Sequence, residues 1–328
     1  MHQCFCCAGL GHICDGLPEV LRASREEIRR GATHIKIMAS GGVSSPTDRI
    51  TSTQFSEEEI KAIVNEANAA NIPVMAHAYT ARAINRAIKC GVKSIEHGNL
   101  LNTESVDLLI KYNAFLVPTL IIYKALIEQG VEAGLSQDLV NKTYEVLDAG
   151  IDALELAYKK NVQIVYGTDL LGIMHPHQLE EFTLRSKVIP SLQLIQQATI
   201  NAAKLFNLEK EIGQIDEGFF ADLIVLNKNP VDDIKALTDP KKYLRNVIKN
   251  GYVCNINWYM SKIINTIKIN KKIAYLQKLK ELNKDSGLIF NSLNKILNNF
   301  IGHKLFTILK FDKINSKLER IYTSNPKE

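Results

Sequence analysis

Four polar side chains stand in or at the ends of segments that otherwise have the pattern of buried strands. Lys36 lies inside HIKIMASGG, His77 ends PVMAH, His97 ends SIEH and Asp169 closes VQIVYGTD. Two imidazoles and a carboxylate are an ordinary ligand set for zinc or manganese. A lysine ammonium would be repelled by a dication, so Lys36 fits such a site only if its charge is removed or reversed.

Each of these residues also has a structural interpretation. A lone histidine near a strand end is more often hydrogen-bonded within the protein than bound to a metal, and Asp169 could cap the following helix. A lysine in a strand is most often paired with a carboxylate or points to solvent. Four such residues at equivalent strand ends would have to coincide by chance, which favours a common site.

The elements that must position these residues alternate helix with strand. The helix signals include a capping box from Ser56 to Glu59. Five helix-then-strand units are predicted, over residues 17–40, 56–78, 80–98, 104–120 and 148–169. Such repeats indicate a parallel sheet covered by helices, either an open doubly wound sheet or a closed (β/α)₈ barrel. In both, the carboxyl ends of the strands meet at one edge, where the four residues would converge.

Several longer segments resemble the amidohydrolase superfamily, metal-dependent hydrolases on a (β/α)₈ barrel, and especially its imidazolonepropionase-like and Xaa-Pro dipeptidase (prolidase)-like members. The segments are GATHIKIMASGGVSSPTD, HAYTARAINRAIKCGVKSIEHGNLL, FLVPTL, YGTDLLG and GQIDEGFFADLIVL, and the resemblance spans roughly residues 15 to 253. It implies an α/β fold: a partial TIM (β/α)₈ barrel of strands four to eight over residues 1–208. A remnant of the C-terminal β-sandwich element over 209–254 and a helical basic extension over 255–328 would follow.

The resemblance also implies roles for the four residues. In similar enzymes the strand-four lysine is carbamylated by CO₂, so Lys36 would become an anionic ligand that bridges two metals. His77 and His97 would hold the second metal. Asp169 would bind the first metal and carry a proton from the bridging hydroxide to the leaving amine. Tyr79 would donate a hydrogen bond to the substrate, with a structural tyrosine as the alternative, and His175 and His177 could line the pocket.

The sequence departs from the family pattern at its start. Met1 precedes the predicted fourth strand by only a short distance, and the family's first-strand His-x-His is absent. We therefore expect a half-site that binds one metal ion or none, with zinc or manganese as the metal. Hydrolysis of amide or peptide C–N bonds should be impaired. Two open sheet edges would favour poor stability or self-association.

Two other classes of function stay open. One is a non-catalytic fragment or binding remnant of the same fold. The other, an open-sheet nucleotide binder, is disfavoured because ASGGVSS lacks the spacing of a phosphate loop. For a catalytic chain, the substrates would be small molecules such as dipeptides or cyclic amides.

Charge is unevenly distributed. The chain of 328 residues has 40 basic and 35 acidic residues, of which 14 basic and 5 acidic lie from Asn255 on, so the tail carries +9 and the rest −4. No nucleic-acid motif or aromatic stacking pattern accompanies the basic tail, and we expect no membrane or nucleic-acid contact by it. Four of the six cysteines bunch near the start, which is no disulfide framework and predicts a cytoplasmic protein. Cys4, Cys6 and His12 fit no familiar zinc spacing.

Overall fold

The computed structural model describes residues 11–43, 48–132, 136–254, 307–312 and 317–323. Contacts along the backbone divide the chain into two compact units, Met1–Ile256 and Asn257–Glu328. The elements of the first unit are α1 (Leu17–Arg29), β1 (Ile35–Met38), α2 (Glu57–Ala69), β2 (Val74–Thr80), α3 (Ala81–Lys89), β3 (Ser94–Leu100), α4 (Thr103–Lys111), β4 (Phe115–Val117), α5 (Leu120–Gln129), α6 (Gln137–Lys159), β5 (Gln163–Ile164), the 3₁₀ helix η2 (Gly172–His177), α7 (Glu180–Arg185), α8 (Ser191–Ala198), α9 (Ile200–Leu205), β6 (Leu223–Leu226), α10 (Lys235–Thr238), α11 (Pro240–Tyr243), β7 (Leu244–Lys249) and β8 (Tyr252–Cys254).

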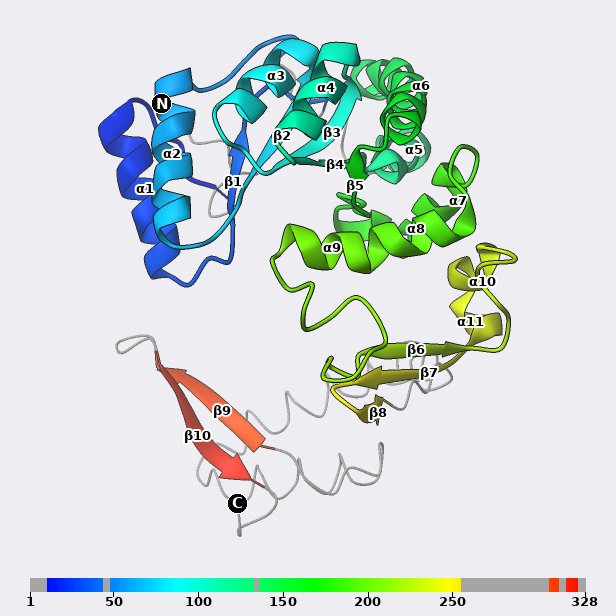
Figure 1. The fold of residues 1–328 in the computed structure, drawn as a ribbon. Helices are drawn as coiled ribbons and strands as arrows, with labels where there is room; N and C mark the ends of the chain where they lie inside the picture. Colours follow the sequence, from blue (N-terminus) through cyan, green and yellow to red (C-terminus); the bar gives the residue numbers. More distant parts are fainter. Residues whose placement is uncertain (1–10, 44–47, 133–135, 255–306, 313–316, 324–328) are drawn as a thin grey trace. The chain divides into compact units, whose positions relative to one another are not determined.

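A five-stranded parallel sheet is the centre of the first unit (Figure 1). Its order, β1-β2-β3-β4-β5, follows the chain, and each neighbouring pair is parallel. This confirms the predicted α/β class. A doubly wound sheet reverses its strand order at a switch point, whereas a barrel does not, so the sequential order favours the barrel-type arrangement. No strand among the described residues pairs with the outer edge of β1 or of β5.

Local signals set the boundaries of each helix-strand unit. The predicted capping box is present, since Glu59 N donates to Ser56 Oγ at 3.2 Å and Ser56 N donates to the Glu59 carboxylate at 2.6 Å. Helices α3 and α4 begin after the N-cap residues Thr80 and Asn102. After the helices the chain turns through left-handed residues that are all glycine or asparagine, at Gly31, Asn71, Gly91, Asn113 and Asn161.

The sheet has two apolar faces. One packs against the helices, in a cluster that includes Ile37 of β1, Ile95 of β3 and Leu116 of β4 with Ile60 and Leu154 from α2 and α6. The opposite face, here called the inner face, carries a smaller cluster. It consists of Met75, Phe115, Val117, Val165 and Leu205, the last supplied by α9. Polar residues that alternate with the helix-facing ones on the strands therefore point to the inner face.

Helix α5 was not predicted from the sequence, and α6 begins at Gln137 rather than at the predicted residue 148. The reason for the first difference is that α5 buries residues on nearly every side. A helix that is apolar all round has no amphipathic period to detect. The predicted fifth strand is also shorter than expected, because β5 has only two residues.

A three-stranded antiparallel sheet, in the order β6-β7-β8, follows the α/β part and agrees with the short strands expected there. The second unit contains β9 (Thr307–Asp312) and β10 (Lys317–Thr323), which pair antiparallel. The helical tail was therefore predicted wrongly for residues 307–311, where threonine, isoleucine and phenylalanine favour a strand. The rest of the predicted tail helices lies outside the described residues. The domain boundaries after residues 208 and 254 stay predictions.

Candidate metal and active site

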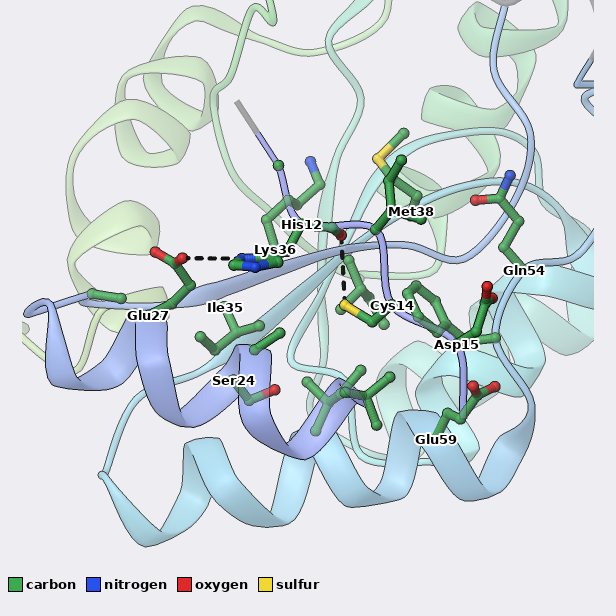
Figure 2. A pocket seen from close by; sticks show the side chains of 18 of the residues that line it. His12, Cys14, Asp15, Ser24, Glu27, Ile35, Lys36, Met38, Gln54 and Glu59 are labelled. Carbon is green, nitrogen blue, oxygen red and sulfur yellow. Dashed lines mark hydrogen bonds and ion pairs between the residues drawn. The ribbon is translucent and has the colours of Figure 1, made fainter. Parts of the chain in front are cut away.

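Lys36 lies on the inner face of edge strand β1. Ile35 and Ile37 are buried against the helices, while Lys36 is exposed and Met38 is 46% exposed. Figure 2 shows Lys36 in a cavity of about 900 Å³ that runs along β1 and is also lined by His12, Cys14 and Glu27. His77, His97 and Asp169 do not line this cavity, which follows the free edge of the sheet.

His77 comes from β2 and is in register with Met38, so it lies on the same face as Lys36 one strand away. Its Nε2 is 3.1 Å from the Gly41 carbonyl oxygen. Gly41 has to be glycine, because a Cβ there would lie 2.1 Å from the Arg49 carbonyl oxygen. Burial, followed by the positive charge of Lys36, lowers the pKa of His77 to about 4, so the ring is neutral near pH 7.

His97, in the middle of β3, has a left-handed backbone with φ 74°. Its Nδ1 is 2.7 Å from Thr119 Oγ1, and its Nε2 is 4.0 Å from Asp169 Oδ2. A His97 that holds a metal ion through Nε2 needs its proton on Nδ1, where the Thr119 hydroxyl can accept it. Burial, His77 and Lys36 hold the pKa of His97 well below its usual range.

Asp169 follows β5, also in a left-handed conformation with φ 52°. Its side chain is 52% exposed, so water reaches the carboxylate, while the other side faces His97. Partial desolvation raises the pKa of Asp169, and the charge of Lys36 opposes that shift. The carboxyl is thus a better proton acceptor than an ordinary surface aspartate.

Two tyrosines enclose the histidines. The Tyr79 ring stacks on His97 with centroids 5.1 Å apart and meets His77 edge-on at 5.0 Å. Its hydroxyl lies 3.2 Å from that of Tyr123, which is also 3.0 Å from Asn99 Oδ1. Tyr79 is 3% exposed, and burial raises its pKa above the usual range. It stays protonated, with its hydroxyl engaged inside the protein in this structure.

The fit of a divalent ion can be tested on these distances. Zinc bonds of about 2.1 Å to nitrogen and to oxygen allow two ligands of one ion to lie at most about 4.2 Å apart. His97 Nε2 and Asp169 Oδ2 fall within that limit at 4.0 Å. Within the described part of the chain, no three His, Cys, Asp or Glu side chains are grouped closely enough to hold an ion. The third candidate donor, His77 Nε2, is the one bonded to Gly41. In this structure His97 and Asp169 are thus within reach of one ion, and His77 would join them only by giving up its bond to Gly41.

Three other histidines of the described residues, His12, His175 and His177, have other surroundings. His177 Nδ1 is 2.6 Å from Glu180 Oε1 and its Nε2 is 3.0 Å from Gln129, while His175 is exposed on η2. His12 faces Glu27 at 3.6 Å, and its imagined partners Cys4 and Cys6 lie outside the described residues.

Sequence reasoning missed two residues of the site. Thr119 follows the β4 strand and orients His97, and the only signal was its position after a buried strand. Glu96 is in register with His77, so it lies on the inner face, where it accepts a hydrogen bond from Ser94 at 2.5 Å. Burial raises the pKa of Glu96, and the positive charge of Lys36 opposes this. Period-two counting along β3 would have placed Glu96 on that face.

Comparison with known proteins follows the same segments. A model of the amidohydrolase family matches residues 1–254. Ochratoxinase from Aspergillus niger is 38% identical over 237 residues, which are 71% of this chain and 49% of that protein. A solved prolidase in complex with N-methylphosphonate-L-proline is 45% identical, with a TM-score of 0.74, over 77% of this chain and 63% of that chain. A Xaa-Pro dipeptidase with bound methionine in the active site is 34% identical, with a TM-score of 0.67, over 74% and 59%. The chain spans about half the length of the curated relatives it matches.

Proposed function

We propose that this chain, which belongs to the amidohydrolase family, hydrolyses C–N bonds of small amide substrates with the help of a divalent metal ion. The observation that carries the proposal is the meeting of His77, His97 and Asp169 at the carboxyl end of the parallel sheet. Two neutral imidazoles and a carboxylate at this edge are the kinds of donors that a zinc site uses, which supports the proposal.

His97 and Asp169 would hold the ion together with His77, whose Nε2 would exchange the Gly41 carbonyl for it. When bound, such an ion lowers the pKa of a water molecule and polarises the substrate carbonyl. Three ligands and a fourth open position are the usual arrangement of a catalytic zinc site. Zinc or manganese agrees with the nitrogen and oxygen donors.

Lys36 would take part as a carbamate. The Lys36 ammonium would first lose one proton to solvent. Its neutral amine would then attack CO₂, forming an N–C bond as one C=O π bond opens onto oxygen, and would release a second proton, so that the cation becomes an anion. The position supports this role, since Lys36 lies on the inner face one strand from His77 and its side chain is open to dissolved CO₂ along the cavity beside β1. The charge reversal would remove the repulsion between Lys36 and a bound cation.

Asp169 would move the proton. As water attacks the carbonyl carbon of the amide, the carboxylate takes one proton from it and then gives that proton to the leaving nitrogen. Its raised pKa and half-exposed position suit both steps. Tyr79 and Tyr123 exclude bulk water behind the histidines, which strengthens the electrostatic interactions at the site.

Dipeptides that end in proline are the first substrates to test, because prolidase and Xaa-Pro dipeptidase are among the similar structures. The described residues offer three candidate donors for one ion, so we expect about one ion per chain.

The test is the metal content of monodisperse protein prepared with zinc or manganese and bicarbonate, followed by hydrolysis of a panel of Xaa-Pro dipeptides and N-acyl amino acids. The matched control is Asp169→Asn, which keeps size and a ligand oxygen but accepts no proton. Metal-dependent turnover that D169N abolishes supports the proposal. Metal bound by His77 and His97 with no turnover of any amide would favour the alternative, a binding module, and no bound metal would contradict the proposed site.

A further inference from the structure

A buried ion pair lies behind the site and has no part in the proposed chemistry. Arg185 and Glu181, one turn apart on α7, are both 0% exposed, and Arg185 Nε donates to Glu181 Oε1 at 2.6 Å. Removing two charges from water costs several kcal/mol for each ion, and apolar residues of the same volume are often as stable. The contacts that this pair makes outside α7 therefore explain it better than the pair's own attraction does.

Glu181 holds the start of α5. Its Oε1 accepts from Leu120 N at 3.2 Å and its Oε2 from Ile121 N at 2.6 Å. These amides directly follow Thr119, which has the left-handed conformation, with φ 48° and ψ 46°, that β-branched residues rarely adopt. Thr119 has no side-chain bond to the helix it precedes, so its hydroxyl is available to His97. The Glu181 carboxylate thus accepts hydrogen bonds at the start of α5, as the side chain of an N-cap residue usually does.

Arg185 holds the chain that leads to Asp169. Val165 N donates to Leu116 O at 2.9 Å, so in a parallel ladder the Val165 carbonyl would next accept from residue 118. That residue is Pro118, which has no N–H. Arg185 replaces it, with Nη1 donating to Val165 O at 3.0 Å and Nη2 to Gly167 O at 3.4 Å. Gly167 is two residues before Asp169.

The contacts of Glu181 and those of Arg185, here called the two arms of the pair, lead to the same site. His97, Thr119 and Asp169 all have positive φ, a conformation that costs roughly 1–3 kcal/mol at each non-glycine residue unless neighbours impose it. One arm fixes Thr119 and through it the His97 ring, and the other fixes the segment before Asp169. The geometry thus links the two atoms that lie 4.0 Å apart, His97 Nε2 and Asp169 Oδ2, through one buried pair.

We propose that Glu181 and Arg185 are positioning residues that set the tautomer of His97 and the separation between His97 and Asp169. The inference rests on the proposed function for its purpose, since the separation matters for holding a metal ion. It goes beyond that function because it assigns a task to two residues that touch neither metal nor substrate.

Three variants of the full chain test it. Glu181→Gln keeps the shape but weakens the arm to Thr119, whereas Arg185→Lys keeps the charge but removes the fork that reaches two carbonyls. The double variant Glu181→Leu with Arg185→Met removes both charges at similar volume and with them every hydrogen bond of both arms. Ile60→Ala is the stability control, because Ile60 is 0% exposed on α2 and lies outside the site.

The first readout is the imidazole ¹⁵N spectrum of metal-free protein, with the His97 signals assigned by their loss in His97→Asn. We expect the Nδ1–H tautomer of His97 in the unaltered chain and in R185K. In E181Q and in the double variant we expect a mixture of tautomers. The second readout is zinc affinity by calorimetry, which should fall by about tenfold or more in E181Q, R185K and the double variant, as for other residues that orient metal ligands. I60A should change neither.

The outcomes separate this inference from the proposed function. If the unaltered chain binds no zinc, the proposed function fails, and the tautomer of His97 still tests the Glu181 arm. If E181Q and R185K both fold with unchanged His97 signals and zinc affinity, the pair is structural and the inference is wrong. Should the double variant fail to fold, the two single variants decide. An equal loss of affinity in I60A would also contradict a positioning role.

Discussion

The two ends of the parallel sheet hold their polar residues in different ways. On the β3–β5 side, His97 is 4% exposed and its Nδ1 is bonded to Thr119 at 2.7 Å. On the β1 side, Lys36 is exposed on an edge strand and lines an open cavity. The comparison teaches that a residue type at a strand end sets the candidate chemistry, whereas burial and hydrogen bonds determine how firmly it is held. The following predictions test this contrast.

The largest difference should appear when one residue of each side is removed. We expect His97→Ala to abolish zinc binding, because it removes a neutral, oriented ligand. Lys36→Ala should leave binding of one ion measurable and remove only its dependence on bicarbonate. Calorimetry with and without bicarbonate checks both. Equal losses in the two variants would mean that the site depends on both sides alike.

Stability should show the same contrast. Leu116 is 1% exposed in β4, so Leu116→Ala should lower the free energy of unfolding by about 2–5 kcal/mol. Met38 is 46% exposed on β1, and Met38→Ala should cost about 0.5 kcal/mol or less. Urea unfolding followed by circular dichroism measures both. A cost for Met38 near that for Leu116 would show that the inner face of β1 is covered in solution.

Acid should destabilise the metal-free protein through the buried histidines. The pKa of His77 is lowered to about 4, so as the pH falls from the unfolded value of 6.5 the unfolded state binds the proton first. The free energy of unfolding is therefore highest above about pH 6.5, and protonation of the unfolded histidine lowers it by about 3 kcal/mol by about pH 4. The positive charge of Lys36 lowers the pKa of His77 in the same direction as burial, whereas the bond to the Gly41 carbonyl opposes both. In His77→Asn the slope of stability against pH should be smaller; an unchanged slope would rule out His77 as its source.

The smallest predicted effect concerns the hydroxyl of Thr119. Thr119→Val keeps the shape but removes the acceptor of the His97 Nδ1 proton, and zinc affinity should fall by about tenfold. Thr119→Ser keeps the hydroxyl and is the control. A valine variant that binds zinc like the serine variant would show that stacking on Tyr79 is enough to orient His97.

The order of helices and strands could be predicted because its signals are local. The capping box at Ser56 and the periodic apolar residues are visible without the fold. Parallel strands bring His77 and Asp169 to one edge, whereas strand register pairs His77 with Glu96 and His97 departs from it with a left-handed backbone that the sequence does not indicate. Glu181 and Arg185 could not be predicted as a buried pair, because charges four apart on a short helix have the pattern of an exposed ion pair. Nor does the sequence indicate the left-handed backbone of Thr119, since nothing local favours it.

The remaining expectations concern membrane crossing, self-association, the carbamate and the metal. Among the described residues no helix combines the length and apolarity needed to cross a bilayer. Self-association through the edges of the sheet stays a prediction, as do the carbamate on Lys36 and the identity of the metal.

The sequential order of the helix-strand units, each with a left-handed glycine or asparagine after its helix, has a consequence for folding during synthesis. Each strand pairs with the strand that precedes it in the sequence, and each unit carries its own start and stop signals. Pairing with the next strand along the chain keeps each crossover as short as a parallel sheet allows, which limits the entropy lost when the strands come together. During synthesis a newly emerged strand would therefore find the preceding strand already present, and the sheet would grow by one helix-strand unit at a time as the ribosome advances.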